Sequence, residues 1–125
     1  MSHEIYWLRP ERVLYISYQG HQTPETLQWT LDAMAEALDT VIHPVVVLIN
    51  WLEVEDCERG ALLKMSGHRA YSHPMAARGV LVGFDPQLSF ENEVTAVNTR
   101  GDKNTMYFNN MDNAMSYLQP MLEMD

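Results

Sequence analysis

The sequence of 125 residues is poor in several features that mark particular classes of protein. Its single cysteine, Cys57, has no partner for a disulfide within the chain, which fits a reducing compartment. Only 8 Lys and Arg stand against 17 Asp and Glu, giving a net charge of −9 without a basic cluster. Because phosphate neutralisation supplies most of the affinity for nucleic acid, no nucleic-acid partner is expected.

Long apolar runs are also absent from the sequence. No uninterrupted stretch approaches the ~20 residues that span a bilayer, and the first residues, Met-Ser-His-Glu, do not have the pattern of a secretory leader. An acidic chain is also repelled by an anionic membrane surface. We therefore expect a cytoplasmic protein without stable membrane insertion.

What is present is the composition of one ordinary globular domain. Hydrophobic residues make up 46% of the chain and charged residues 20%, which are usual values. A chain of this length buries roughly two thirds of the surface that its unfolded form exposes. We expect a single domain over residues 1–125 that folds without a disulfide, a metal or a cofactor.

The first third of the chain predicts a β-hairpin followed by a helix. Residues 5–8 and 13–18 are rich in β-branched and aromatic side chains, and a short segment with Pro10 separates them. Thr23 and Pro24 then have the chemistry of a helix cap and first turn, and apolar residues follow at helical spacing.

The rest of the chain alternates between strand and helix patterns. Residues 45–49 form an unbroken aliphatic run, typical of a strand buried on both faces of a parallel sheet. Helices are expected at 60–71, at 88–98 and after Asn110, where Pro120 should kink or end the helix after about two turns; strands are expected at 79–84 and 105–108. The order β-β-α-β-α-β-α-β-α predicts an α/β domain with a mostly parallel sheet and one antiparallel edge strand.

Four stretches carry a resemblance to a known family: "VLYISYQGHQTPET", "HPVVVLIN", "SHP" before "RGVLVGF", and "MYFNNMDNAMSYL". They resemble STAS-like domains (sulfate-transporter and anti-sigma-factor-antagonist), especially bacterial SpoIIAA-like proteins, which are related to CRAL-TRIO lipid-transfer domains. The resemblance implies a superhelix of βα units that serves as a regulatory or ligand-binding module without a reaction of its own.

In the anti-sigma-factor antagonists of this family, a serine after the central strand is phosphorylated at the start of a helix. The corresponding segment here, residues 56–60, reads Asp-Cys-Glu-Arg-Gly. The acceptor serine is absent, and this departure counts against the same phosphorylation switch. A permanent negative charge from Glu58 is an alternative that the resemblance leaves open.

The segment "NWLEVEDCERGA" holds the cysteine and the densest group of carboxylates. Glu55, Asp56 and Glu58 oppose formation of a thiolate at Cys57, which favours an ordinary cysteine over a nucleophile. The acids lack the spacing of a calcium loop. We expect Asp56 to cap the following helix and Glu58 to interact with its dipole.

No catalytic or metal-binding motif is found elsewhere. His68 and His73 lie five residues apart, which is not the spacing of a helical metal pair. Nucleotide-binding glycine motifs and the hydrolase serine motif are missing from the sequence. An enzyme would need a histidine and a carboxylate that converge on Cys57 or on a serine, and we treat this as the less favoured reading.

Ligands of parallel α/β sheets bind outside the carboxyl ends of the strands. The candidate contact residues are those expected at these ends and in the acidic segment: His21, Asn50, Trp51, Asp56, Cys57, Glu58, Phe84, Asp85 and Asn109. We expect a non-enzymatic module that binds a protein partner through residues 51–60 and the next helix. The alternative is a small apolar or lipid-like ligand in a pocket lined by Trp51, Met65 and Phe84, and a homodimer is a further hypothesis.

Overall fold

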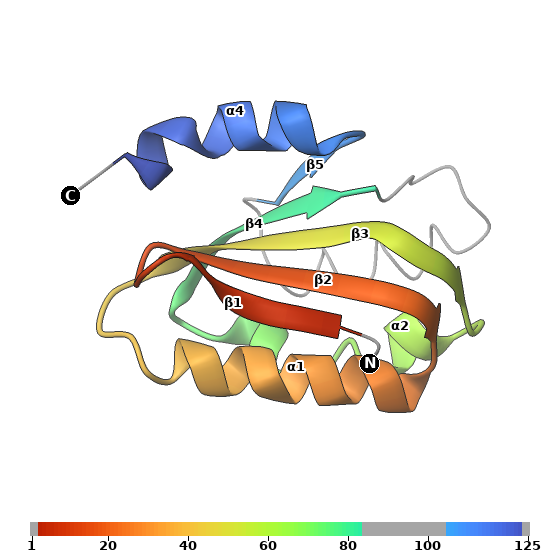
Figure 1. Ribbon diagram of the computed structural model, residues 1–125. Coiled ribbons are helices and arrows are strands. Elements are labelled where there is room, and N and C mark those ends of the chain that lie inside the picture. The colour runs from red at the N-terminus through yellow and green to blue at the C-terminus, as the bar shows by residue number, and fades with distance from the viewer. Residues whose placement is uncertain (1–2, 84–104, 124–125) are drawn as a thin grey trace.

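The computed structural model describes residues 3–83 and 105–123 and places five strands in one sheet between helices (Figure 1). Its elements are β1 (His3–Arg9), β2 (Val13–Gln22), α1 (Pro24–Leu38), β3 (Val45–Cys57), α2 (Ala61–Lys64), the 3₁₀ helix η1 (Arg69–Ser72), β4 (Ala76–Val82), β5 (Met106–Phe108) and α4 (Met111–Leu122). Helices α1 and α2 cover one face of the sheet, and α4 lies on the other (Figure 1). The helix predicted at 88–98 lies outside the described residues.

The strands follow one another across the sheet in the order in which they occur in the chain, β1-β2-β3-β4-β5. The first pair is antiparallel, and the other three pairs are parallel. This confirms the predicted α/β architecture, a mostly parallel sheet with one antiparallel edge strand.

The sheet separates two hydrophobic cores, and β2 contributes to both. Leu14 points toward α1 and packs with Leu31, while its neighbour Val13 packs on the α4 face with Leu48 and Leu118. This division follows from the period of two along a strand, which sends consecutive side chains to opposite faces. All five residues are 1% exposed or less.

Helix α1 begins where the sequence predicts. The Thr23 hydroxyl accepts a hydrogen bond from the Thr26 backbone N–H (3.2 Å), and the Thr26 hydroxyl accepts one from the Thr23 N–H (2.8 Å). This reciprocal capping satisfies two donors at the helix start. Pro24 occupies the first turn, where its missing N–H costs no helical bond.

The prediction of a long helix over 60–71 is wrong. The helix α2 has only 4 residues, and the chain then turns into η1. Gly67 disfavours helix in this stretch, and the His68 ring binds the backbone N–H of Ala70 (3.0 Å), which draws that donor away from a continuous helical ladder. The connection from β3 to β4 is therefore held by short-range backbone turns together with side-chain hydrogen bonds.

Of the two outcomes expected at Pro120, a kink or the end of the helix, the second is wrong. Helix α4 continues through Pro120 to Leu122. A proline removes one backbone donor, but the final turn keeps a bond from the Glu123 N–H to the Gln119 carbonyl (3.1 Å). Met121 and Leu122 pack against the core on this face, which stabilises the extra turn.

Candidate functional site

The carboxyl ends of β2 and β3 bring His21 beside Asp56. The two residues are register partners in the parallel ladder, and the His21 Nδ1 atom is hydrogen-bonded to the Asp56 carboxylate. Both side chains are exposed to solvent. The hydrogen bond and the charge of Asp56 raise the pKa of His21. The pair places an imidazole ring in hydrogen-bond contact with a carboxylate at the exposed carboxyl ends of β2 and β3.

Cys57 lies on the opposite face of β3 from this pair. Its register partner, Gln22, is buried, and Cys57 itself packs against the core on the α1 face. Its Sγ atom donates to the Glu58 carbonyl oxygen at 3.7 Å. Burial, and then the proximity of Cys57, raise the pKa of the Tyr71 phenol. The thiol therefore faces an aromatic interior, while the His21 and Asp56 pair faces solvent.

The prediction that Asp56 caps the next helix is wrong. Strand β3 continues to Cys57, and the Glu58 N–H still donates to the Gln22 carbonyl (2.8 Å). Asp56 is thus part of the ladder, four residues before the cap position. That position is Gly60, whose φ of 84° lies in the left-handed region and whose helix start has no side-chain cap. Glycine adopts this conformation without steric cost.

The exposed residues at this turn form a surface that we name the β3–α2 corner. It consists of Glu53, Glu55, Asp56, Glu58, Arg59 and Leu63. Leu63 is 52% exposed, whereas its neighbour Leu62 is 4% exposed and packs in the core on the α1 face. The corner thus combines four carboxylates and one guanidinium with an apolar side chain that solvent reaches, and the residue after Leu63, Lys64, is also exposed.

The other predicted contact residues have different surroundings. Asn50 is buried, where its amide donates to the Tyr15 hydroxyl (2.9 Å) and its oxygen accepts from the Leu52 N–H (2.9 Å). Trp51 is buried, with its ring centroid 5.0 Å from that of Tyr18. Asn109 is exposed after β5, two strands from β3. Phe84 and Asp85 lie outside the described residues.

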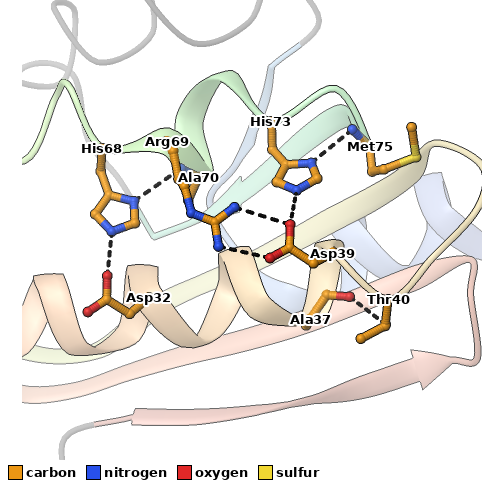
Figure 2. A network of polar contacts seen from close by, with 9 residues as sticks. All are labelled: Asp32, Ala37, Asp39, Thr40, His68, Arg69, Ala70, His73 and Met75. Atoms are coloured by element: carbon orange, nitrogen blue, oxygen red, sulfur yellow. Dashed lines mark hydrogen bonds and ion pairs between the residues drawn. The ribbon is translucent and has the colours of Figure 1, made fainter.

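A polar network that the sequence patterns did not indicate joins α1 to the connection between α2 and β4 (Figure 2). The Asp39 carboxylate accepts two hydrogen bonds from the Arg69 guanidinium (2.9 and 3.1 Å), and His73 Nε2 lies 2.8 Å from its Oδ1 atom. Two turns earlier in α1, Asp32 contacts His68 Nε2 at 2.7 Å. Asp32 and Asp39 are seven residues apart, which places them two helical turns apart on one face of the helix. This spacing is the one sequence pattern that relates the two acids of the network.

Each histidine of this network bridges a backbone amide and a carboxylate. The Nδ1 atoms of His68 and His73 accept hydrogen bonds from the Ala70 and Met75 N–H groups, at 3.0 and 3.1 Å. A neutral ring that accepts at Nδ1 carries its proton on Nε2 and donates there. The hydrogen bonds from Arg69 and then His73 hold the pKa of Asp39 well below its usual range.

Further classes of site are not indicated in the described part of the chain. Among residues 3–83 and 105–123, no group of three or more His, Cys, Asp or Glu is arranged to hold a metal ion. None of the helices in these ranges is long and apolar enough to cross a bilayer.

Comparisons with known proteins identify the fold. A scan against protein-family models finds no match, and a search of curated proteins finds no relative. Among solved structures, an uncharacterized DUF3478-family protein with a SpoIIAA-like fold from Shewanella loihica PV-4 aligns with a TM-score of 0.65, 18% identity and 94% coverage of both chains. The anti-sigma-factor antagonist SpoIIAA, in its unphosphorylated form, aligns with a TM-score of 0.59 and 11% identity over 94% of this chain and 97% of that one.

The sheet order, the helices on both faces and these alignments define the class of fold, an α/β domain with a mostly parallel five-stranded sheet. More specifically, the chain has the SpoIIAA-like fold, which confirms the resemblance drawn from the sequence. At 18% and 11% identity, what is shared is the fold.

Proposed function

We propose that this domain is a non-enzymatic regulatory module that binds a protein partner through the β3–α2 corner. The observation that carries the proposal is Leu63, a leucine 52% exposed in α2, the helix that follows the exposed acidic segment with Asp56 and Glu58. An apolar side chain within a charged rim has the arrangement of a protein contact surface. The SpoIIAA-like fold adds support, since one protein with this fold is an anti-sigma-factor antagonist.

The chemistry of the corner favours a partner with basic side chains around an apolar pocket. Between residues 53 and 64 four exposed carboxylates, Glu53, Glu55, Asp56 and Glu58, outnumber the two exposed basic side chains, Arg59 and Lys64. Charge complementarity of this kind speeds association and excludes partners of like charge. Only three residues, 58–60, separate the end of β3 from the start of α2, so Leu63 follows the carboxylates closely in the chain.

Two arrangements count against the other functions considered. The histidine and carboxylate pair and the Cys57 thiol point to opposite faces of β3, so His21 is not oriented as a base for this thiol. Trp51, expected to line an apolar ligand pocket, packs instead against Tyr18. Both arrangements favour contact between proteins over chemistry or enclosure of a ligand.

Site-specific photo-crosslinking tests the proposal. A photoreactive phenylalanine analogue replaces Leu63 in one variant and Ile42 in a matched control, and the full chain is expressed in its own host. Ile42 is 88% exposed and precedes β3, at the opposite end of that strand from Leu63. We expect one cross-linked protein from position 63, absent from position 42 and lost when Asp56→Lys and Glu58→Lys are added.

Equal labelling from both positions, or none from position 63, would contradict the proposal. Native mass spectrometry of the protein purified from the same cells tests the alternative function, binding of a small apolar ligand. If a small apolar molecule is retained and position 63 gives no cross-link, the domain binds that ligand and not a protein partner through the corner.

A further inference from the structure

The edge strand β1 carries a second surface, at the opposite side of the sheet from β5. Within the described residues, β1 pairs with β2 alone, so its outer side presents backbone groups without a neighbouring strand. Exposed edges of this kind are templates for another strand unless charge, proline or a bulge blocks them. From His3 to Trp7 the strand has no proline, no lysine and a regular register with β2.

Two exposed aromatic side chains flank this edge. Tyr6 is 50% exposed and lies on Tyr15 of β2, with ring centroids 4.9 Å apart. Trp29 on α1 is 51% exposed and contacts the ring of His3 edge-on at 4.9 Å. Apolar surface is therefore available both on the sheet face and on the helix layer beside the strand.

The charged side chains of β1 lie on either side of Tyr6, with Glu4 two residues before it and Arg9 three residues after it. Glu4, Tyr6 and Arg9 have Ser17, Tyr15 and Val13 as their register partners, and these are alternate residues of β2. Cross-strand partners share a face of the sheet, so all three side chains lie on one face. An irregularity between Trp7 and Arg9 brings the arginine onto it. One acid and one base therefore stand on either side of a central tyrosine.

We propose that β1 pairs antiparallel with β1 of a second copy of this chain, with Tyr6 on the two-fold axis. In this register Glu4 of each copy lies opposite Leu8 of its partner and next to the partner's Arg9, so each end of the interface joins opposite charges. A two-fold interface requires such self-complementarity. The two five-stranded sheets become one continuous sheet.

Net charge favours this face over the rest of the molecule for contact between copies. Two chains of net charge −9 repel each other. The β1 hairpin is locally balanced, because Glu4 and Glu11 are matched in number by Arg9 and Arg12. The β3–α2 corner, with four carboxylates, is the wrong surface for a second acidic copy.

A charge swap tests the proposed register by sedimentation equilibrium. We expect the wild-type mass to rise with concentration toward that of two chains, Glu4→Arg to remain a monomer, and Glu4→Arg with Arg9→Glu to regain the dimer. Within one chain, five residues of strand separate these side chains by about 17 Å, so rescue requires contact between copies. Ile42→Lys is the matched exposed control and leaves the mass unchanged.

A disulfide trap gives an independent readout of the two-fold axis. Residues opposite each other in antiparallel strands have Cα atoms about 4.5–5.5 Å apart, within the range of about 4.4–6.8 Å that a disulfide spans. In a Cys57→Ser background, Tyr6→Cys should oxidise to a covalent dimer, and Ile42→Cys should not. A wild-type monomer at all concentrations, a dimer indifferent to Glu4→Arg, or equal oxidation at both positions would overturn the proposal.

Discussion

Helix α2 presents two adjacent leucines to opposite environments, and their truncation should have unequal effects on stability. Leu62 is 4% exposed and packs in the core on the α1 face, whereas Leu63 is 52% exposed. Leu→Ala in a core costs the transfer free energy of the lost carbons plus a cavity term, about 2–5 kcal/mol. Because α2 is a short surface helix that relaxes around the cavity, we expect Leu62→Ala to cost ~2–3 kcal/mol.

The same substitution at Leu63 removes a side chain that solvent already reaches, and alanine has the higher helix propensity. We therefore expect Leu63→Ala to change the free energy of unfolding by no more than about 0.5 kcal/mol. Urea unfolding followed by tryptophan fluorescence measures both variants. With a slope of about 1–2 kcal/mol per molar urea, Leu62→Ala lowers the midpoint by ~1–3 M and Leu63→Ala leaves it nearly unchanged. Equal losses would refute the orientation of α2 and, with it, the β3–α2 corner as a contact surface.

Two further predictions concern the polar network and the turn into α2. Hydrogen bonds from Arg69 and His73 lower the pKa of Asp39, so this carboxylate stabilises the fold fully above its unfolded pKa of about 3.9 and loses that contribution as the pH falls toward the folded value. Asp39→Asn should therefore lower the urea midpoint at pH 7, and the difference in midpoint between this variant and the wild type should narrow below about pH 4. A difference that stays constant with pH would exclude the charge of Asp39 as its cause. Gly60→Ala forces an alanine into a left-handed φ of 84° and should cost about 1–2 kcal/mol of unfolding free energy in the same assay. Gly67→Ala is the control: a Cβ atom added there meets no atom within 4 Å, so this variant should not be destabilised. Similar losses at both glycines would contradict a strained turn at Gly60.

Local signals were enough to predict the framework of the fold. The Thr23 cap, the following Pro24 and the aliphatic run that starts at Val45 act over a few residues, and the structure has a helix start and a central strand there. The sheet class followed from the alternation of such elements.

The errors occurred where distant residues decide local structure. Residues 52–57 are mostly polar, and they are strand because Gln19 to Gln22 of β2 pair with them. Similarly, the contacts of Asp32 and Asp39 with His68 and Arg69 cross 36 and 30 positions of sequence. Patterns in a single sequence report local structure and do not show which distant side chains are in contact. Neither the full length of β3 nor the polar network was therefore predicted from them.

Because the described strands lie in the sheet in sequence order, its two edges form at different times during synthesis. Since β2, β3, β4 and β5 each add beside the preceding strand, no strand of the described residues is inserted between two that are already paired. A ribosome that releases these strands in order extends this sheet from β2 toward β5. Among the described strands β1 is an edge from the first hairpin onward, so any contact that it makes with another chain is available before the rest of the domain is complete.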